Sequence, residues 1–252
     1  MNKKNNHRIY HYNNLTNVIF RIDFPKQLIV SWNNLKKEFE SKFPKNNQII
    51  GQSVELQIKD FKHTTKQEKL TAWQFMDKNE EKKIVIDSAS LTVEIYKYKG
   101  FDDLLDTIKF VLNGFEKYHN IEIINRLGLR YINQIEFKPA KKPLDWEGLI
   151  NSNLTCVTDN FFNKKSLSRS LHFLEMNEKE YRLRFQFGMY NSEYPSTIVN
   201  KEFVLDYDCI TVDTLLPKEI ENTTNKFHEI IYKLFEDSIG EKLREEMSDD
   251  KS

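Results

Sequence analysis

The sequence predicts an α+β protein in which two similar halves form one curved antiparallel sheet, with two long helices on one of its faces. Residues 126–137, RLGLRYINQIEF, alternate apolar and polar side chains except at Ile132 and Asn133, which is the signature of a half-buried strand. Residues 101–118 and 217–246 carry apolar side chains at helical spacing, which is typical of amphipathic helices packed on a sheet. Runs of alternating residues between these segments supply the remaining strands.

The first half of the chain reads as β-α-β-β-β-α. Its expected strands are residues 18–24, 51–60, 72–76 and 84–98, and its expected helices are residues 32–43 and 101–118. Pro25 ends the first strand and Pro44 stops the first helix, because proline lacks the N–H group and restricts the residue before it. Polar residues 62–69 predict a turn, and residues 84–98 form either one long, bent strand or two strands broken near Ser88–Ser90.

The second half repeats the same order of elements. Its expected elements are strand 126–137, helix 144–151, strands 168–176, 181–190 and 198–212, and helix 217–246. This order predicts a pseudo-duplicated β-α-β-β-β-α unit, on pattern alone. We therefore expect one integrated domain, divided into a flexible polar arm (1–14), a first half with the shared central strand (15–137), a second half (138–247) and a polar tail (248–252). The sheet would be an open saddle or a wide barrel.

The composition argues against several classes of function. Among 252 residues, 38 lysines and arginines balance 38 aspartates and glutamates, whereas proteins that bind nucleic acid through phosphates usually carry a basic excess. Cys156 and Cys209 are isolated, the six histidines lack metal-ligand spacing, and no glycine-rich phosphate loop occurs, so we expect no metal and no cofactor. The polar N-terminus and the absence of a bilayer-length apolar run predict a cytoplasmic protein without a membrane segment.

Charged residues on the expected polar face of the sheet are the candidate ligand-binding residues. Two arginine pairs lie in matching places of the two halves, and three further charged residues share the face: Arg126 and Arg130, Arg182 and Arg184, with Lys59, Glu55 and Glu94. Guanidinium groups bind phosphate or carboxylate through two parallel hydrogen bonds, and a concave sheet would bring them together on one ligand. Gly128 leaves room beside the first pair. Equally, opposite charges paired across strands on a solvated face explain the same residues without a ligand.

Three functions fit this pattern. The leading hypothesis is a non-enzymatic binding or regulatory module that holds a phosphorylated ligand, a nucleic-acid segment or a partner protein, although the neutral charge does not favour nucleic acid. The alternative is a metal-dependent phosphoanhydride hydrolase of the tunnel-barrel type, in which Glu55, Glu94 and Asp206 or Asp208 converge on a metal ion. A third possibility is an interaction subunit whose functional surface is helical.

Several segments resemble those of a sporadically distributed, uncharacterised prokaryotic protein family of about this length. The matching segments are Phe24-Pro25, the W-x-F of Trp73–Phe75, SLTVEIYKYKGFDDLLDTI, the GLRYIN strand at 128–133, and H-x-x-I-x-x-x-F-x-x-x-I beginning at His228. Thr16 and Asn17 depart from the P-x-x-E-like residues expected before the first aromatics. The resemblance implies a single full-length unit and, from the patchy distribution of the family, a role in defence or on mobile elements. It implies no catalytic residues.

Overall fold

The computed structural model describes residues 8, 10–26, 32–59, 62–138, 142–160 and 163–248, without the side chains of residues 52–70. Its strands are β1 (Leu15–Asp23), β2 (Lys45–Lys59), β3 (Lys62–Met76), β4 (Lys82–Ile86), β5 (Ser90–Ile95), β6 (Arg126–Phe137), β7 (Ser170–Asn177), β8 (Tyr181–Met189) and β9 (Lys201–Thr211). Its helices are α1 (Trp32–Phe39), α2 (Phe101–Glu116), α3 (Ser152–Asp159), α4 (Ile220–Ser238) and α5 (Glu241–Ser248), with short 3-10 turns η1 (Lys164–Ser166) and η2 (Pro217–Glu219).

The described strands form one nine-stranded sheet in the order β2-β3-β4-β5-β1-β6-β9-β8-β7, and every neighbouring pair is antiparallel. The predicted α+β class with a single antiparallel sheet is confirmed. Strands β2 and β7 are free edges, so the sheet does not close into a barrel. From the central pair β1 and β6, the order runs through the first half of the chain in one direction and through the second half in the other.

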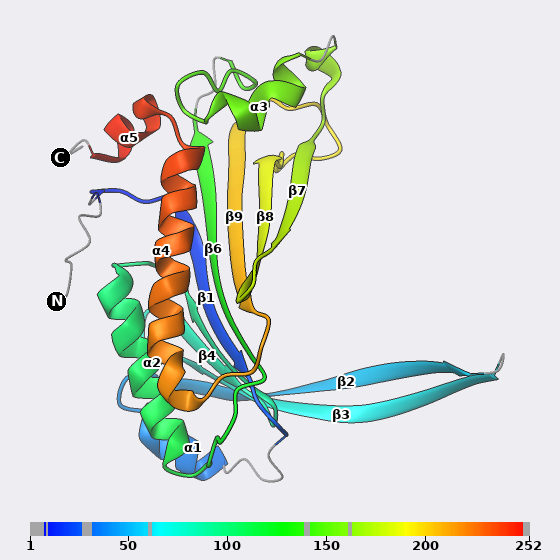
Figure 1. The fold of residues 1–252 in the computed structure, drawn as a ribbon, viewed down its shortest axis with the longest axis vertical. Helices are drawn as coiled ribbons and strands as arrows, with labels where there is room; N and C mark the ends of the chain where they lie inside the picture. Colours follow the sequence, from blue (N-terminus) through cyan, green and yellow to red (C-terminus); the bar gives the residue numbers. More distant parts are fainter. Residues whose placement is uncertain are drawn as a thin grey trace.

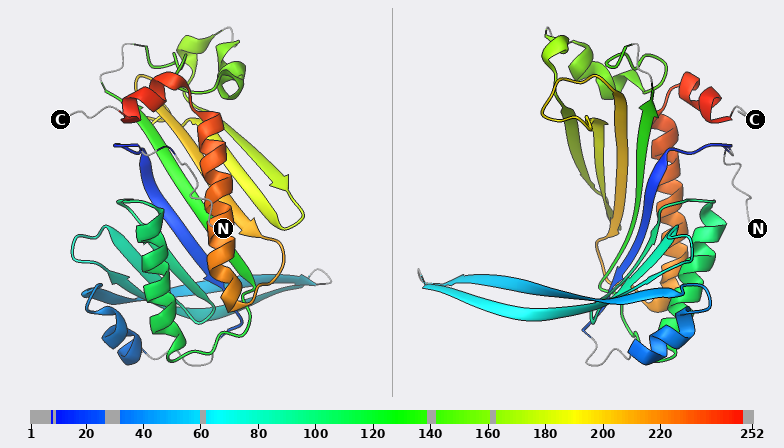
Figure 2. Two further views of the ribbon diagram at one scale, coloured as in Figure 1. Left: turned by 60° about the vertical axis from the view of Figure 1, so that its left-hand side comes forward. Right: turned by 180° about the vertical axis from the view of Figure 1, so that it is seen from behind.

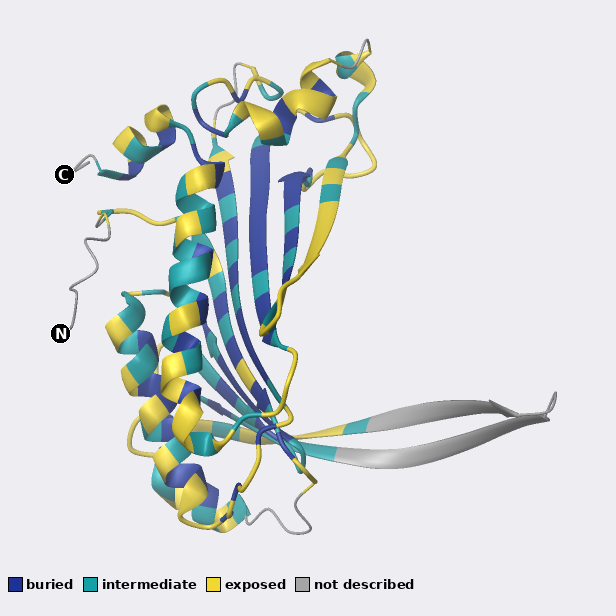
Figure 3. Cartoon of the chain, viewed as in Figure 1, coloured by how far each residue is buried: buried dark blue, intermediate teal, exposed yellow. Residues whose placement is uncertain are grey.

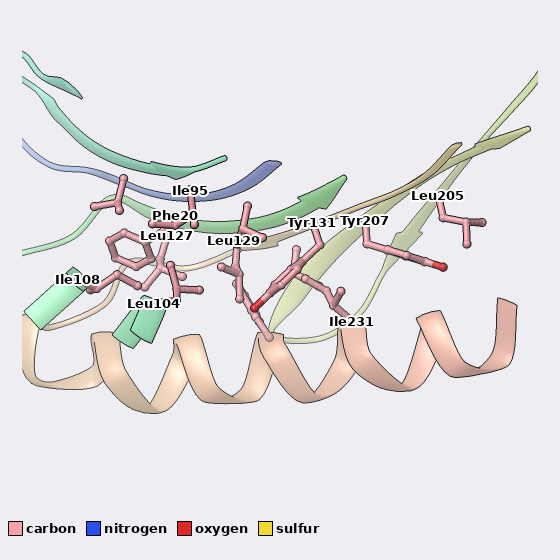
Figure 4. Close-up of a cluster of buried hydrophobic side chains, with 14 of the residues drawn as sticks. Phe20, Ile95, Leu104, Ile108, Leu127, Leu129, Tyr131, Leu205, Tyr207 and Ile231 are labelled. Atoms are coloured by element: carbon pink, nitrogen blue, oxygen red, sulfur yellow. The ribbon is translucent and has the colours of Figure 1, made fainter. Parts of the chain in front are cut away.

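The core lies between the sheet and helices α2 and α4, which cover the same side of it (Figure 1). Figure 4 places Phe20 of β1, Leu129 of β6 and Tyr207 of β9 between the sheet and α4, and all three are buried. Strand β6 displays the expected alternation, because Leu127, Leu129, Tyr131, Asn133 and Ile135 are buried while the residues between them reach the other face. Figure 3 shows the resulting stripes along the central strands.

The β2–β3 hairpin projects from the body of the molecule on the side opposite to α2 and α4 (Figure 2). The two strands pair continuously from Lys45–Met76 to Lys59–Lys62, whereas β4 supports only residues Trp73–Met76 of β3. Residues 62–69, which were expected to form a turn, are therefore part of a long strand. The polar composition of residues 62–69 led to the wrong prediction, because their strand conformation comes from backbone pairing with β2.

Two predicted helices also differ. Residues 144–151 form turns and an isolated bridge, and the helix begins only after Asn151, whose side chain accepts a hydrogen bond from the backbone N–H of Asn153. The terminal helix is interrupted at Ile239 and Gly240, because Ile239 pairs with Ile150 and a Cβ on Gly240 would lie 2.1 Å from the carbonyl oxygen of Gly148. Contacts made by the 144–151 segment thus determine where helix α3 begins and where helix α4 ends.

The segment 84–98 contains two strands, β4 and β5, so the second of the two predicted alternatives is correct. The carboxylate of Asp87 accepts hydrogen bonds from the N–H groups of Ala89 and Ser90 and closes the turn between the strands.

Within the part of the chain that the structure describes, no helix has the length and apolarity needed to span a membrane.

Candidate functional site

The face of the sheet opposite α2 and α4 carries a continuous row of charged residues. The strand registers place the following residues side by side from β4 to β7: Lys83, Glu94, Ile19, Arg130, Asp208, Arg184 and Glu175. Except at Ile19, positive and negative side chains alternate across the strands. Directly opposed residues in an antiparallel sheet lie about 4.5–5.5 Å apart, so each charge has a neighbour of opposite sign.

Arg130 forms a bidentate ion pair on this face. Its Nε and Nη2 atoms donate to the two carboxylate oxygens of Asp206 at 2.8 and 2.6 Å. The carboxylate is largely buried, while the arginine side chain remains 41% exposed. The hydrogen bond to Asp206 raises the pKa of Arg130. This bidentate pair occupies the edge of the guanidinium that a phosphate group would use.

Arg126 is the first residue of β6 and lies opposite Asp23 of β1. Its Nη1 atom is 3.3 Å from Oδ2 of Asp23, and the other oxygen of the same carboxylate accepts a 2.7 Å hydrogen bond from Arg21. Its Nη2 atom would be 3.7 Å from a Cβ on Gly128, so the side chain extends over this glycine. The expected room beside Arg126 is therefore taken by Arg126 itself.

The second arginine pair contacts the edge strand β7. Arg184 donates from Nε to Glu175 at 2.9 Å, and both side chains are 43% exposed. Arg182 donates to the side-chain oxygen of Asn177 at 2.9 Å. Arg182 thus has a neutral partner, whereas Arg126, Arg130 and Arg184 each contact a carboxylate.

Asp208 lies between the arginines of the two neighbouring strands, opposite Arg130 on β6 and Arg184 on β8. Partial burial raises the pKa of Asp208, while Arg126, Arg130 and Arg184 act in the opposite direction. The carboxyl group is therefore easier to protonate than an exposed aspartate, although it lies among cations.

Glu94 lies apart from the arginines and from Asp208. It contacts Lys83 at 2.8 Å and accepts a 2.7 Å hydrogen bond from the hydroxyl group of Tyr96. Strands β1 and β6 lie between Glu94 on β5 and Asp208 on β9. Three strand spacings amount to about 14 Å along the sheet, beyond the reach of two carboxylates that share one metal ion. The side chains of Lys59 and Glu55 lie outside the described residues; the backbone places both on the outer part of β2.

Sequence reasoning grouped the arginines correctly on one face but missed their partners. Asp206 and Asp208 were considered as metal ligands or as part of a solvated face, and neither they nor Asp23 and Glu175 were linked to a particular arginine. The sequence gives only a weak signal for these pairs, because the residue that lies opposite a strand arginine depends on register and strand order. Among the described residues, no three side chains of histidine, cysteine, aspartate or glutamate are grouped as a metal site would require.

Comparisons with known proteins give no functional assignment. No protein-family model matches the chain. No curated protein matches it significantly in sequence. The function is therefore argued from the geometry of the charged face.

Proposed function

We propose that this protein is a non-enzymatic binding module that docks a partner protein on the charged sheet face around Arg126, Arg130, Arg182 and Arg184. The observation that carries the proposal is the row of alternating charges from Lys83 to Glu175 on the face that α2 and α4 leave uncovered. A row of both signs on a rigid sheet is complementary to a second mixed-charge surface. Such complementarity supports specificity and rapid association.

A protein partner fits this face better than a phosphorylated ligand or nucleic acid. Phosphate would have to displace the buried carboxylate of Asp206 from its two hydrogen bonds with Arg130. Asp208 and Glu175 on the same face would repel phosphate at close range. A protein surface supplies lysines or arginines for these carboxylates as well as acidic groups for Arg182.

The proposal includes two structural predictions, the pseudo-duplication of the chain and the equivalent placement of α2 and α4. The strand order on either side of the β1–β6 pair is what a pseudo-duplicated chain would give, with β2 as an additional strand in the first half. Helices α2 and α4 then occupy equivalent places after β5 and β9, which leaves the opposite face of both halves for the partner.

Membership in the uncharacterised prokaryotic family, a role in defence or on mobile elements, and a cytoplasmic location stay predictions from the sequence. The family and its role rest on the segments that resemble it, of which GLRYIN occupies the central strand β6. A tunnel-barrel hydrolase is not favoured, because Glu94 and Asp208 are separated by two strands of an open sheet.

The proposal is tested by native and denaturing mass spectrometry on the protein purified from its own source. A partner protein that is bound by the wild type and lost from Arg126→Ala/Arg130→Ala would support it. The matched control is Lys109→Ala/Lys117→Ala, which removes two ion-paired cations from α2 and the turn after it, away from the sheet face, and should retain the partner.

Three outcomes would contradict the proposal. A partner retained by the arginine variant would place the interface elsewhere. A nucleotide or oligonucleotide lost from the same variant would identify a phosphate ligand. Absence of any bound molecule would leave the row of ion pairs as a solvated surface.

A further inference from the structure

Strand β7 forms an edge of the sheet and exposes apolar side chains on both faces. Leu171 and Phe173 are 38% and 59% exposed on the charged face, and Leu174 and Met176 are 48% and 37% exposed on the helix side. Figure 3 shows the strand as the most exposed one of the upper sheet. Four large apolar side chains on one short edge strand are unusual for a surface in contact with water.

The backbone of β7 is also ready to pair. Glu178 donates its N–H to the carbonyl of Tyr181, so the even-numbered residues of β7 hydrogen bond to β8. The odd-numbered residues Leu171, Phe173 and Glu175 therefore direct their N–H and C=O groups outward from the sheet edge. The strand contains no proline or lysine, and its register with β8 is continuous without a bulge. Proline, lysine and bulges are features that usually prevent an edge strand from pairing, and β7 has none of them.

We propose that β7 pairs antiparallel with β7 of a second copy of this chain, about a two-fold axis at Phe173. This pairing joins the two sheets into one and leaves no free β7 edge, so the assembly closes as a dimer. Each strand covers the apolar side chains of the other on both faces, which a ligand bound to one face would not do.

Strand overlap and charge together favour this register. An axis at Phe173 pairs residues 170–176 of the two β7 strands, whereas an axis at His172 would pair only residues 170–174. With the axis at Phe173, Glu175 lies opposite Leu171 and diagonal to Arg169 of the second copy. With the axis at Leu174, the next register that keeps the faces matched, the two Glu175 side chains lie diagonal to each other. Diagonal neighbours are within reach of long side chains, and like charges there are unfavourable.

The same register continues the packing on both sides of the junction. Phe173 meets its own copy at the centre of the charged face. On the helix side, Leu174 lies opposite His172, whose ring stacks on Phe187 at 5.1 Å, and Phe187 stacks on Phe185 at 4.8 Å. An existing aromatic cluster thus extends across the interface. The proposal does not rest on the partner protein, because the pairing uses the β7 edge and leaves Arg126 and Arg130 on β6 accessible.

Sedimentation equilibrium over micromolar to millimolar concentrations tests the association. We expect the full-length chain to reach twice the mass of one copy, and Phe173→Asp to weaken association about tenfold or more. Ile50→Asp is the matched control: Ile50 is also 59% exposed but lies on β2, the opposite edge, and its variant should associate as the wild type does. A wild type that stays monomeric, or equal weakening by both variants, would overturn the proposal.

Disulfide trapping tests the register. In a Cys156→Ser background, which removes the exposed native cysteine, Phe173→Cys should form a disulfide-linked dimer in mild oxidant. Leu174→Cys should not, because in this register residue 174 pairs with residue 172 and not with its own copy. Linkage through residue 174 alone, or through neither residue, would overturn the two-fold pairing at Phe173.

Discussion

At the level of single residues, the four arginines illustrate what a sequence pattern can and cannot identify. Period-two alternation places Arg126 and Arg130 on the face opposite the core, and the structure agrees. Alternation contains no information on which strands are neighbours. The pairing of Arg130 with Asp206, 76 positions away, follows from the register between β6 and β9. Three of the four expected anchors are thus paired with carboxylates of the sheet, and their role in binding stays a prediction.

His119 provides a pH-dependence prediction at this level. The ring is buried, stacks on Phe115 at 4.4 Å, and its Nε2 atom has no hydrogen-bond partner among the described residues. Burial lowers the pKa of His119 below its ordinary value. The unfolded chain then binds this proton more readily than the folded one. Stability is complete above the unfolded pKa of about 6.5 and decreases as pH falls through the lower folded pKa.

Urea unfolding between about pH 7.5 and 5.5 measures this effect. We expect the wild type to lose stability on acidification and His119→Gln to lose less. His11→Gln, which replaces an exposed histidine near the N-terminus, should behave like the wild type. Equal loss in all three proteins would show that His119 does not titrate within this range.

At the level of elements, most strands and helices of the sheet body were predictable, whereas segments whose path depends on contacts distant in the chain were not. Strand β6 and helix α2 each have a mostly apolar face against the core, so their periodicity is strong. Residues 62–69 lie in the outer hairpin, where their strand conformation comes from pairing with β2. The 144–151 segment contains Trp146 and Ile150, both buried, but it follows loop geometry imposed by its contacts with Ile239.

The contact between α1 and α2 gives a prediction for Gly114. Glycine within a helix normally costs stability relative to alanine. Here a Cβ on Gly114 would lie 2.6 Å from Cε1 of Phe39, a fully buried ring that contacts Phe75 and Phe110. We therefore expect Gly114→Ala to reduce the free energy of unfolding by about 1–3 kcal/mol, through overpacking.

The control is the neighbouring exposed residue of the same helix. Asn113→Ala should raise the free energy of unfolding by about 0.5 kcal/mol, because helix propensity acts there without a clash. Both are read from chemical denaturation. Stabilisation by Gly114→Ala would mean that Phe39 moves aside freely.

At the level of the whole molecule, the central β1–β6 pair joins the two halves. Buried residues of both halves belong to one hydrophobic cluster, which includes Phe20 and Phe75 from the first and Phe203 and Phe227 from the second. A continuous core and sheet predict cooperative unfolding of the described body as one unit.

The three tryptophans report on this cooperativity. Trp32 stacks on Trp73 at 5.6 Å in the first half, and Trp146 packs against Phe203 at 5.1 Å in the second. In Trp146→Phe the fluorescence reports the first half, and in Trp32→Phe/Trp73→Phe it reports the second. For each variant, we expect the fluorescence midpoint to coincide with its own far-UV circular dichroism midpoint. Separate midpoints would indicate two independently unfolding units.

The sequence by itself determined the class of the protein, the presence of most of its elements, and which residues of each central strand face the core. These properties depend on local periodicity. They do not require the packing partner of each element to be known, because an apolar face can be buried against any apolar surface. The tertiary structure alone decided strand order, the extent of the β2–β3 hairpin, the partners of the arginines and the exposure of β7. Those depend on contacts between residues distant in the chain, and a one-residue shift of register or an exchange of two strands would rearrange every cross-strand pair while leaving the local pattern unchanged.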